Sequence, residues 1–232
     1  MRIGIVGAGN MGSALARRWI GAGHSVSLSF ARDQEKLAAL AAALGPSASV
    51  DQPREAAAIS DVVLLSVPFE ALDDAIAAIG GPHAAKPLVT TISPYAADFT
   101  GQGVDLRSRF GTRSAAEEIA SRLPTFQVVE AFNLTFADLL SEEALPFEGR
   151  RPTVPLCGDH VNAKQAVARL IDDAGLVALD VGDLRVARTL EQLATGWVQF
   201  AAASGLFPQT GLSILHPSQT PSSIQDDLQG AH

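Results

Sequence analysis

The sequence predicts an α/β fold of the doubly wound Rossmann type, with a mostly parallel sheet and a small C-terminal α/β extension. Two observations support this prediction. Short runs of β-branched residues alternate with longer Ala- and Leu-rich segments, a pattern typical of successive βαβ units. The first of these runs, at residues 2–6, leads directly into a glycine-rich turn. With 47% hydrophobic and 18% charged residues, the chain has an ordinary globular composition and a sufficient supply of core residues.

The first part of the chain divides into strands and helices by its hydrophobic pattern. The expected strands are residues 2–6, 25–30, 62–67, 88–92 and 127–131. The expected helices are residues 11–21, 34–43, 54–59, 70–79 and 114–123. In the first helix Met11, Leu15 and Trp19 recur every fourth residue, so one side of that helix can pack on the sheet.

The pattern continues differently after residue 132. Strands are expected at 153–157 and 176–181, with a helix at 161–173 that Asp159 would cap and Gly175 would end. A last helix, near 184–204, carries an apolar stripe that suits either a core or a dimer face, and we expect a homodimer. The stripe consists of Leu190, Leu193, Trp197 and Phe200.

These elements predict three regions. Residues 1–150 form the Rossmann domain, residues 151–216 form a small C-terminal α/β subdomain, and residues 217–232 form a flexible tail without periodicity. Segments 98–109 and 140–151 are expected to be loops.

The charge balance excludes several classes of partner. The formal net charge is −8, whereas nucleic acids and anionic membranes require clustered Lys and Arg. No apolar run reaches the roughly 18 residues of a membrane helix, and the first strand leaves no room for a signal peptide, so a cytoplasmic protein is expected. The single cysteine, Cys157, and five scattered histidines predict neither a disulfide nor a metal site.

Residues 7–12 match the motif G-x-G-x-x-G between an expected strand and an expected helix. In dinucleotide-binding proteins the first glycine, here Gly7, makes the tight turn. The second, here Gly9, lets the backbone approach the pyrophosphate, and the third, here Gly12, lets the helix approach the sheet. The helix start would then offer backbone N–H groups to the phosphates. A merely structural turn is the alternative.

The end of the second strand indicates which dinucleotide is bound. NAD enzymes place a carboxylate there for the ribose 2′-hydroxyl, whereas NADP enzymes use a cation and small donors. Here Ser29 and Phe30 end the strand and Arg32 follows, which favours NADP. Two alternatives stay open: Arg32 is a solvated surface residue, or Asp33 accepts from the ribose, although Asp33 also suits a helix N-cap.

Two further strand ends are expected to border the same crevice. Ser66, Val67 and Pro68 follow one strand and are expected to line the cofactor site, although Pro68 also suits a strand stop. Ser93 follows the next strand and is expected there too, with Tyr95 near the substrate space or on a surface loop.

The chain resembles the F420-dependent NADP oxidoreductase family, which includes the NADPH-binding domain of the STEAP metalloreductases. The resemblance extends to about residue 215, and most of its matches lie outside the glycine motif that unrelated Rossmann enzymes share. The matching segments are residues 7–12 (GAGNMG), 29–36, 61–72 (DVVLLSVPFEAL), 112–123, 128–133 (VVEAFN), 156–164 (LCGDHVNAK) and 179–191 (LDVGDLRVARTLE).

The resemblance implies site residues as well as a fold. It assigns the phosphates to Ala8, Asn10 and Met11, the 2′-phosphate to Ser29 and Arg32, and the nicotinamide to Val67, Pro68 and Asn133. Two positions depart from the family pattern. One cation is missing after the second strand, where this chain has Ala31-Arg32-Asp33, and Asn133 stands where some F420 reducers carry histidine.

The resemblance implies an NADP-dependent enzyme that transfers a hydride between NADPH and a deazaflavin (F420) or a flavin-like acceptor stacked on the nicotinamide. Such chemistry needs ring placement rather than a nucleophile or metal. Asn133 is the expected catalytic residue, although asparagine is also a common turn residue. The alternatives are an NADP-binding sensor without turnover, or an NADPH reductase of an imine, a keto acid or a ferric chelate. Pyrroline-carboxylate and hydroxyacid reductases fit less well, because the chain lacks their long helical domains.

Overall fold

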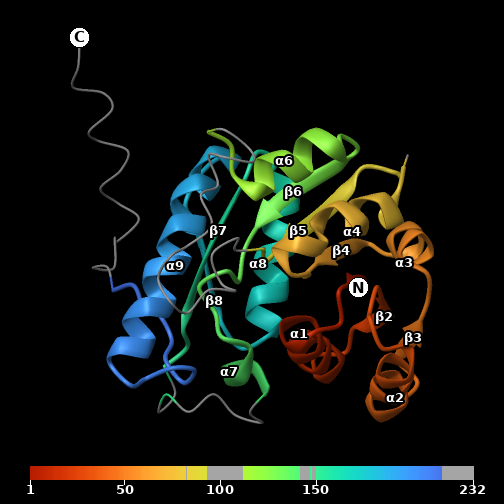
Figure 1. Cartoon of the computed structure of the whole chain (residues 1–232), viewed down its shortest axis with the longest axis horizontal. Coiled ribbons are helices and arrows are strands. Elements are labelled where there is room, and N and C mark those ends of the chain that lie inside the picture. Colours follow the sequence, from red (N-terminus) through yellow and green to blue (C-terminus); the bar gives the residue numbers. More distant parts are fainter. Residues whose placement is uncertain (82, 93–111, 142–146, 148–149, 216–232) are drawn as a thin grey trace, which may run out of the picture.

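The chain forms one mixed sheet with helices on both faces (Figure 1). The computed structural model describes residues 1–81, 83–92, 112–141, 147 and 150–215. The strand order is β3-β2-β1-β4-β5-β6-β7-β8, and only the pair β6–β7 is antiparallel. The predicted doubly wound, mostly parallel fold is therefore confirmed.

The strands are β1 (Arg2–Val6), β2 (Ser25–Ser29), β3 (Ala48–Val50), β4 (Val62–Leu65), β5 (Lys86–Thr90), β6 (Phe126–Glu130), β7 (Thr153–Gly158) and β8 (Val177–Asp180). The α-helices of the described part are α1 (Asn10–Gly21), α2 (Gln34–Leu44), α3 (Pro53–Ile59), α4 (Leu72–Ile79), α6 (Ala115–Arg122), α7 (Ala137–Ser141), α8 (Val161–Asp173) and α9 (Ala187–Ala203). Two short 3₁₀ helices, η1 (Phe69–Ala71) and η2 (Leu184–Val186), precede α4 and α9.

Two hydrophobic cores lie on opposite faces of the sheet. One core packs α1, α7 and α8 against the sheet, and its largest fully buried side chain is Trp19. The indole N–H of Trp19 donates to the carbonyl oxygen of Leu170, at 2.9 Å, and so joins α1 to α8. The other core is built by α3, α4, α6 and α9, and includes Phe69 and Leu190. This two-sided burial explains why the central strands read as continuous apolar runs.

The last two strands extend the same sheet. β7 pairs with β6, β8 pairs with β7, and α9 lies beside them at the end of the sheet opposite to β3 and α2 (Figure 1). The predicted boundary near residue 150 therefore falls within a continuous sheet. The expected tail at 217–232 and the expected loop at 98–109 lie outside the described residues.

Local differences from the prediction have simple causes. The strand β3 was missed because it has only three residues, none of which is buried. The short helix α7 was also missed, and it begins just before the expected loop at 140–151. The cap predicted for α8 is wrong: His160 is the N-cap, and the Asp159 carboxylate instead accepts the backbone N–H of Leu184 at 2.9 Å. Gly175, with φ +87°, follows the end of α8 as predicted.

None of the helices in the described part of the chain combines the length and apolar character that crossing a bilayer requires. The same residues contain no cluster of three His, Cys, Asp or Glu side chains suited to a metal ion.

Candidate functional site

The glycine turn between β1 and α1 lies at the carboxyl edge of the parallel strands. Gly7 has φ +104°, and a Cβ atom on it would lie 2.2 Å from the carbonyl oxygen of Ser66. A Cβ atom on Gly12 would lie 2.2 Å from the carbonyl oxygen of Gly7. Both positions therefore require glycine for the packing of the protein itself.

Gly9 differs from its two neighbours in the motif. A Cβ atom there would meet nothing within 4 Å, and its φ of −73° is open to any residue. The space above Gly9 therefore lies outside the packed protein. The motif assigns that space to a pyrophosphate, so its openness fits the predicted cofactor.

The start of α1 is suited to an anion. Gly9 is the N-cap, no side chain of the described residues caps the helix, and its first turn carries no acidic residue. The first backbone N–H groups of a helix lack partners within the helix and carry its positive dipole end. A phosphate in the open space over Gly9 would satisfy such groups.

A pocket of about 440 Å³, here called the glycine-loop pocket, opens beside this turn. It is bounded by the ends of β1, β2 and β4 and by α2. It contains eight residues predicted from the sequence, namely Gly7, Ala8, Gly9, Phe30, Arg32, Ser66, Val67 and Pro68. Phe30 has φ +57°, a rare value for a residue other than glycine, which turns the chain sharply after β2.

The charged side of the glycine-loop pocket is formed by Arg32, Asp33 and Lys36. Asp33 is the N-cap of α2, and its carboxylate accepts the backbone N–H of Lys36 at 3.0 Å. This hydrogen bond, with the nearby Lys36 ammonium, lowers the pKa of Asp33. Asp33 thus serves the helix as a cap, and Lys36 adds a cation that the sequence analysis missed. The sequence signal that could have identified Lys36 is its position in the first turn of α2, three residues after the capping Asp33.

Four residues predicted for the glycine motif or the 2′-phosphate do not line the glycine-loop pocket, namely Asn10, Met11, Gly12 and Ser29. The Ser29 hydroxyl is fully buried and donates to the carbonyl oxygen of Ile5 at 2.9 Å, so the expectation that it faces a 2′-phosphate is not met. Asn10 is an exposed residue at the first position of α1, and Gly12 is buried against the turn. The prediction for Ser29 was wrong because the side chain of this last residue of β2 is directed into the protein interior. The sequence pattern did not reveal that direction.

A second pocket, of about 350 Å³, adjoins the first and is here called the Asn133 pocket. Val67 and Pro68 line both pockets, and the Thr91 hydroxyl donates to Ser66 at 3.0 Å across their boundary. Apart from Glu70, the described lining is apolar or neutral, and the predicted Met11 and Asn133 belong to it. The residues missed by sequence reasoning are Phe69, Glu70, Thr91, Ile92, Phe132, Thr135, Phe136 and Val198.

Aromatic rings form one wall of the Asn133 pocket. Phe136 lies parallel to Trp197 of α9, with ring centroids 6.5 Å apart and an interplanar angle of 13°. Phe132, with φ +66°, is buried behind the pocket and meets Trp19 edge-on at 6.3 Å. These rings give the pocket flat, apolar surfaces. Ser93 and Tyr95, which were predicted nearby, lie outside the described residues.

Asn133 joins the pocket to a buried carboxyl group. Its Nδ2 donates to Oε1 of Glu130 at 2.6 Å, while its Oδ1 is buried without a partner among the described residues. Glu130 ends β6 and is fully buried, and its carboxyl group contacts that of Glu191 on α9. Burial, with the repulsion of Glu191, raises the pKa of Glu130 well above its ordinary value.

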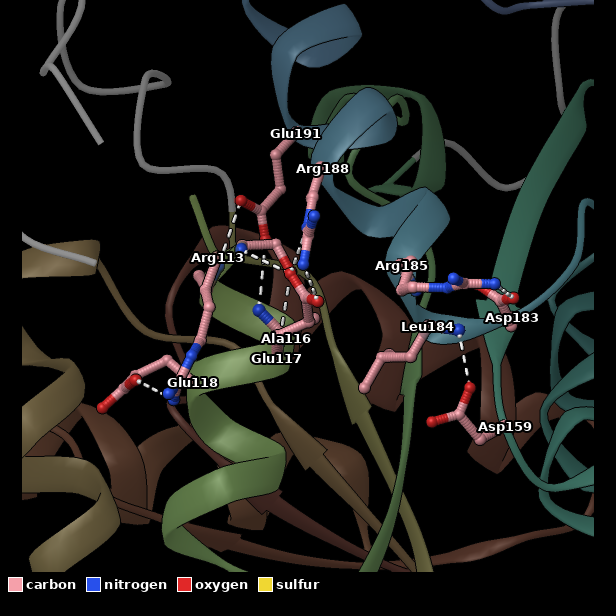
Figure 2. A network of polar contacts seen from close by, with 12 residues as sticks. Arg113, Ala116, Glu117, Glu118, Asp159, Asp183, Leu184, Arg185, Arg188 and Glu191 are labelled. Atoms are coloured by element: carbon pink, nitrogen blue, oxygen red, sulfur yellow. Dashed lines mark hydrogen bonds and ion pairs between the residues drawn. The ribbon is translucent and has the colours of Figure 1, made fainter. Parts of the chain in front are cut away.

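Glu191, the second carboxyl group of this pair, is held by backbone N–H groups of α6. Glu191 reaches from α9 to the first turn of α6 (Figure 2), where its two oxygens accept the backbone N–H groups of Ala115 and Ala116 at 3.1 Å each. Burial raises the pKa of Glu191 to about 7. Neither glutamate was a sequence-based candidate, although both lie in segments that resemble the family, 128–133 and 179–191, because no motif in those segments marks a glutamate for a role. Burial and these two carboxyls also raise the pKa of the Cys157 thiol far above its ordinary value.

Comparisons with known proteins identify relatives of this chain. A family profile described as "NADP oxidoreductase coenzyme F420-dependent" matches residues 2–94. The chain is 30% identical to the F420-dependent NADP reductase of Methanothermobacter thermautotrophicus over 204 residues, which cover 83% of this chain and 86% of that protein. It is 32% identical to the metalloreductase STEAP3 of Rattus norvegicus over 211 residues, which cover 89% of this chain.

The coverage differs between these relatives. This chain spans 40% of the length of the STEAP3 relative. A solved structure from Arthrobacter sp. FB24, provisionally named an F420-dependent NADP reductase, superposes with a TM-score of 0.77 at 24% identity and covers 93% of this chain and 100% of that one. At that identity the likeness concerns the fold.

Proposed function

Because the chain belongs to the F420-dependent NADP oxidoreductase family, we propose that it transfers a hydride between NADPH and a flat deazaflavin (F420) or flavin-like acceptor. The observation that carries the proposal is the meeting of two pockets at Val67 and Pro68. One pocket has the anion-binding turn and two cations, and the other has aromatic walls and one polar amide. A dinucleotide laid across both would place its nicotinamide in the second.

The glycine-loop pocket supplies the groups that an adenosine 2′-phosphate needs. The N–H groups at the start of α1 would hold the pyrophosphate over Gly9, and Arg32 and Lys36 would bind the 2′-phosphate. Lys36 takes the place of the cation that the sequence lacks after Arg32. Asp33 is already engaged as the cap of α2, which weakens its role as a ribose acceptor.

The Asn133 pocket supplies placement rather than acid–base chemistry. When bound, the reduced nicotinamide supplies the hydride, and the acceptor ring receives it. Val67 and Pro68 would support one ring, and the Phe136 wall would exclude water from the reacting faces. The Oδ1 atom of Asn133 lacks a partner among the described residues, and we assign to it a hydrogen bond from the carboxamide N–H of the nicotinamide.

Turnover with different acceptors tests this proposal. NADPH oxidation is followed by absorbance with F420, with FMN and with a ferric chelate, and NADH is compared with NADPH. We expect turnover with F420 or FMN and a preference for NADPH. Tight NADPH binding with no turnover on any acceptor, imine and keto acid substrates included, would instead indicate a sensor, and turnover with the ferric chelate alone would indicate a metalloreductase.

The Asn133→Ala variant tests the placement of the nicotinamide. It removes one hydrogen bond to the bound ring, so we expect a roughly tenfold lower kcat/KM with NADPH. Asn162→Ala, on the exposed side of α8, is the matched control. Equal activity of the two variants would remove Asn133 from the proposed site.

A further inference from the structure

Among the described residues, no salt bridge joins a cation to either carboxyl group of the buried pair Glu130–Glu191. The nearby cations of the described part are engaged elsewhere: their ion pairs are Arg188–Glu117, Lys164–Asp180, Arg113–Glu118 and Arg185–Asp183. Figure 2 shows Arg188 directed to Glu117 while Glu191 is directed to the start of α6. Two touching carboxylates cannot both remain ionised in such a setting.

The hydrogen bonds indicate where a shared proton resides. Both oxygens of Glu191 accept backbone N–H groups at the positive end of α6, which favours an ionised Glu191. Oε1 of Glu130 accepts from Asn133, and its other oxygen, Oε2, is buried without a hydrogen-bond partner in the part of the chain that the structure describes. A proton on Oε2 would let Glu130 donate to Glu191 and would satisfy that atom.

This arrangement determines the orientation of the Asn133 amide. A neutral Glu130 whose hydroxyl is directed to Glu191 has only its carbonyl oxygen left, which must accept from Asn133 Nδ2. The amide is thereby prevented from flipping, and Oδ1, which is buried without a partner among the described residues, is kept as the free acceptor of a residue that lines the Asn133 pocket. An ionised or differently placed Glu130 would not fix the amide in this way.

We propose that Glu130 and Glu191 share one proton and act as positioning residues that hold the Asn133 amide with its oxygen toward the bound ring. The site would thereby select a ligand that donates a hydrogen bond, such as a carboxamide. This step rests on the proposed function, because it assumes that the ring in the Asn133 pocket is the nicotinamide. Other titratable groups around the pair are Glu117 of α6, Arg188 of α9, Cys157 of β7 and Lys164 of α8.

Two substitutions at position 130 separate positioning from simple packing. Glu130→Gln retains an acceptor for Asn133 and a donor for Glu191 without a titratable proton. Glu130→Leu has a similar volume and offers neither. We expect Glu130→Leu to weaken NADPH binding and raise KM roughly five- to tenfold, and Glu130→Gln to restore most of that loss. Glu118→Gln, on the same helix as Glu117 but paired with Arg113, is the control and should match the wild type.

Two spectroscopic measurements do not depend on cofactor binding. Infrared spectroscopy should show the C=O band of a protonated carboxylic acid at neutral pH in the wild type and in Glu118→Gln, and lose it in Glu130→Gln. The side-chain amide NMR signals of Asn133 should be protected from exchange in the wild type and in Glu130→Gln, and exposed in Glu130→Leu.

The outcomes distinguish the two proposals. An absent infrared band in the wild type would overturn the shared proton. Unprotected Asn133 amide signals in the wild type would overturn the positioning role. If both signatures are present but the protein binds no NADPH, the proposed function fails and the proton pair stands. If Glu130→Leu does not fold, the band lost in Glu130→Gln still decides whether Glu130 carries the proton.

Discussion

Gly12 faces Gly7 so closely that a Cβ atom at position 12 would lie 2.2 Å from the Gly7 carbonyl oxygen. This contact fixes the start of α1 against the end of β1. A Cβ atom on the intervening Gly9 would make no such contact, so the glycine at this position keeps open a space outside the packed protein. The three glycines of one motif are therefore required for different reasons, and substitution should separate those reasons.

Gly9→Val is expected to abolish dinucleotide binding and leave the fold intact, because its side chain would occupy the space proposed for the pyrophosphate. Gly12→Ala is the contrasting variant, and we expect it to lower the free energy of unfolding by about 1–3 kcal/mol through overpacking. Calorimetric titration with NADPH and thermal unfolding measure the two effects. Retained NADPH affinity in Gly9→Val would show that no phosphate lies over this residue.

The two cations of the glycine-loop pocket should determine the choice between NADPH and NADH. Arg32→Ala is expected to weaken NADPH roughly tenfold and NADH little, because it removes a charge-assisted hydrogen bond to the 2′-phosphate. Lys36→Ala should act in the same direction but more weakly, since its side chain is 86% exposed and screened by solvent. Fluorescence titration of both nucleotides at low and high salt measures the preference.

Arg17→Ala is the control for both cation variants, because Arg17 is an exposed cation of α1 that lines neither pocket. Equal small losses for NADPH and NADH in Arg32→Ala would mean that Arg32 is a solvated surface residue, the alternative that the sequence left open.

The sequence predicted the features that follow from hydrophobic periodicity, and those that follow from a motif whose residues are required by backbone geometry. The alternation of segments gave the sheet, and the glycine motif located the turn at Gly7 because backbone geometry there allows few residues. Ser29 was misplaced, because the direction of a strand's last side chain depends on its register with β1. Lys36 and Glu130 were missed, since each acquires its role only when separate elements meet.

The exposed face of α9 is where we propose a homodimer contact. Leu193 is 50% and Phe200 is 57% exposed, although both belong to the apolar stripe of this helix. Changing both to glutamate should place charges in such a contact and produce a monomer. Sedimentation should give twice the 24.1 kDa chain mass for the wild type and for Gln192→Glu, an exposed control on the same helix, and the single mass for the double variant. A monomeric wild type would contradict the contact.

The shared proton of Glu130 and Glu191 should make stability depend on pH in one direction. Burial raises both pKa values in the folded protein, to about 7 for Glu191, whereas both lie near 4.5 when the chain is unfolded. The folded state therefore binds more protons between these values, and its stability must fall as pH rises. Glu117 and Asp33, whose pKa values are lowered, lose their contribution only in acid, below this window.

Glu130→Gln removes one titrating group, so the comparison with wild type isolates the pair. From pH 5 to pH 8 the wild-type free energy of unfolding should fall relative to the variant by on the order of 1–3 kcal/mol, since each unit of pKa shift corresponds to about 1.4 kcal/mol. Urea unfolding at four pH values measures this difference, with Glu118→Gln expected to follow the wild type. A difference that stays constant with pH would mean that the folded protein holds no extra proton at this site, and that the orientation of Asn133 has another cause.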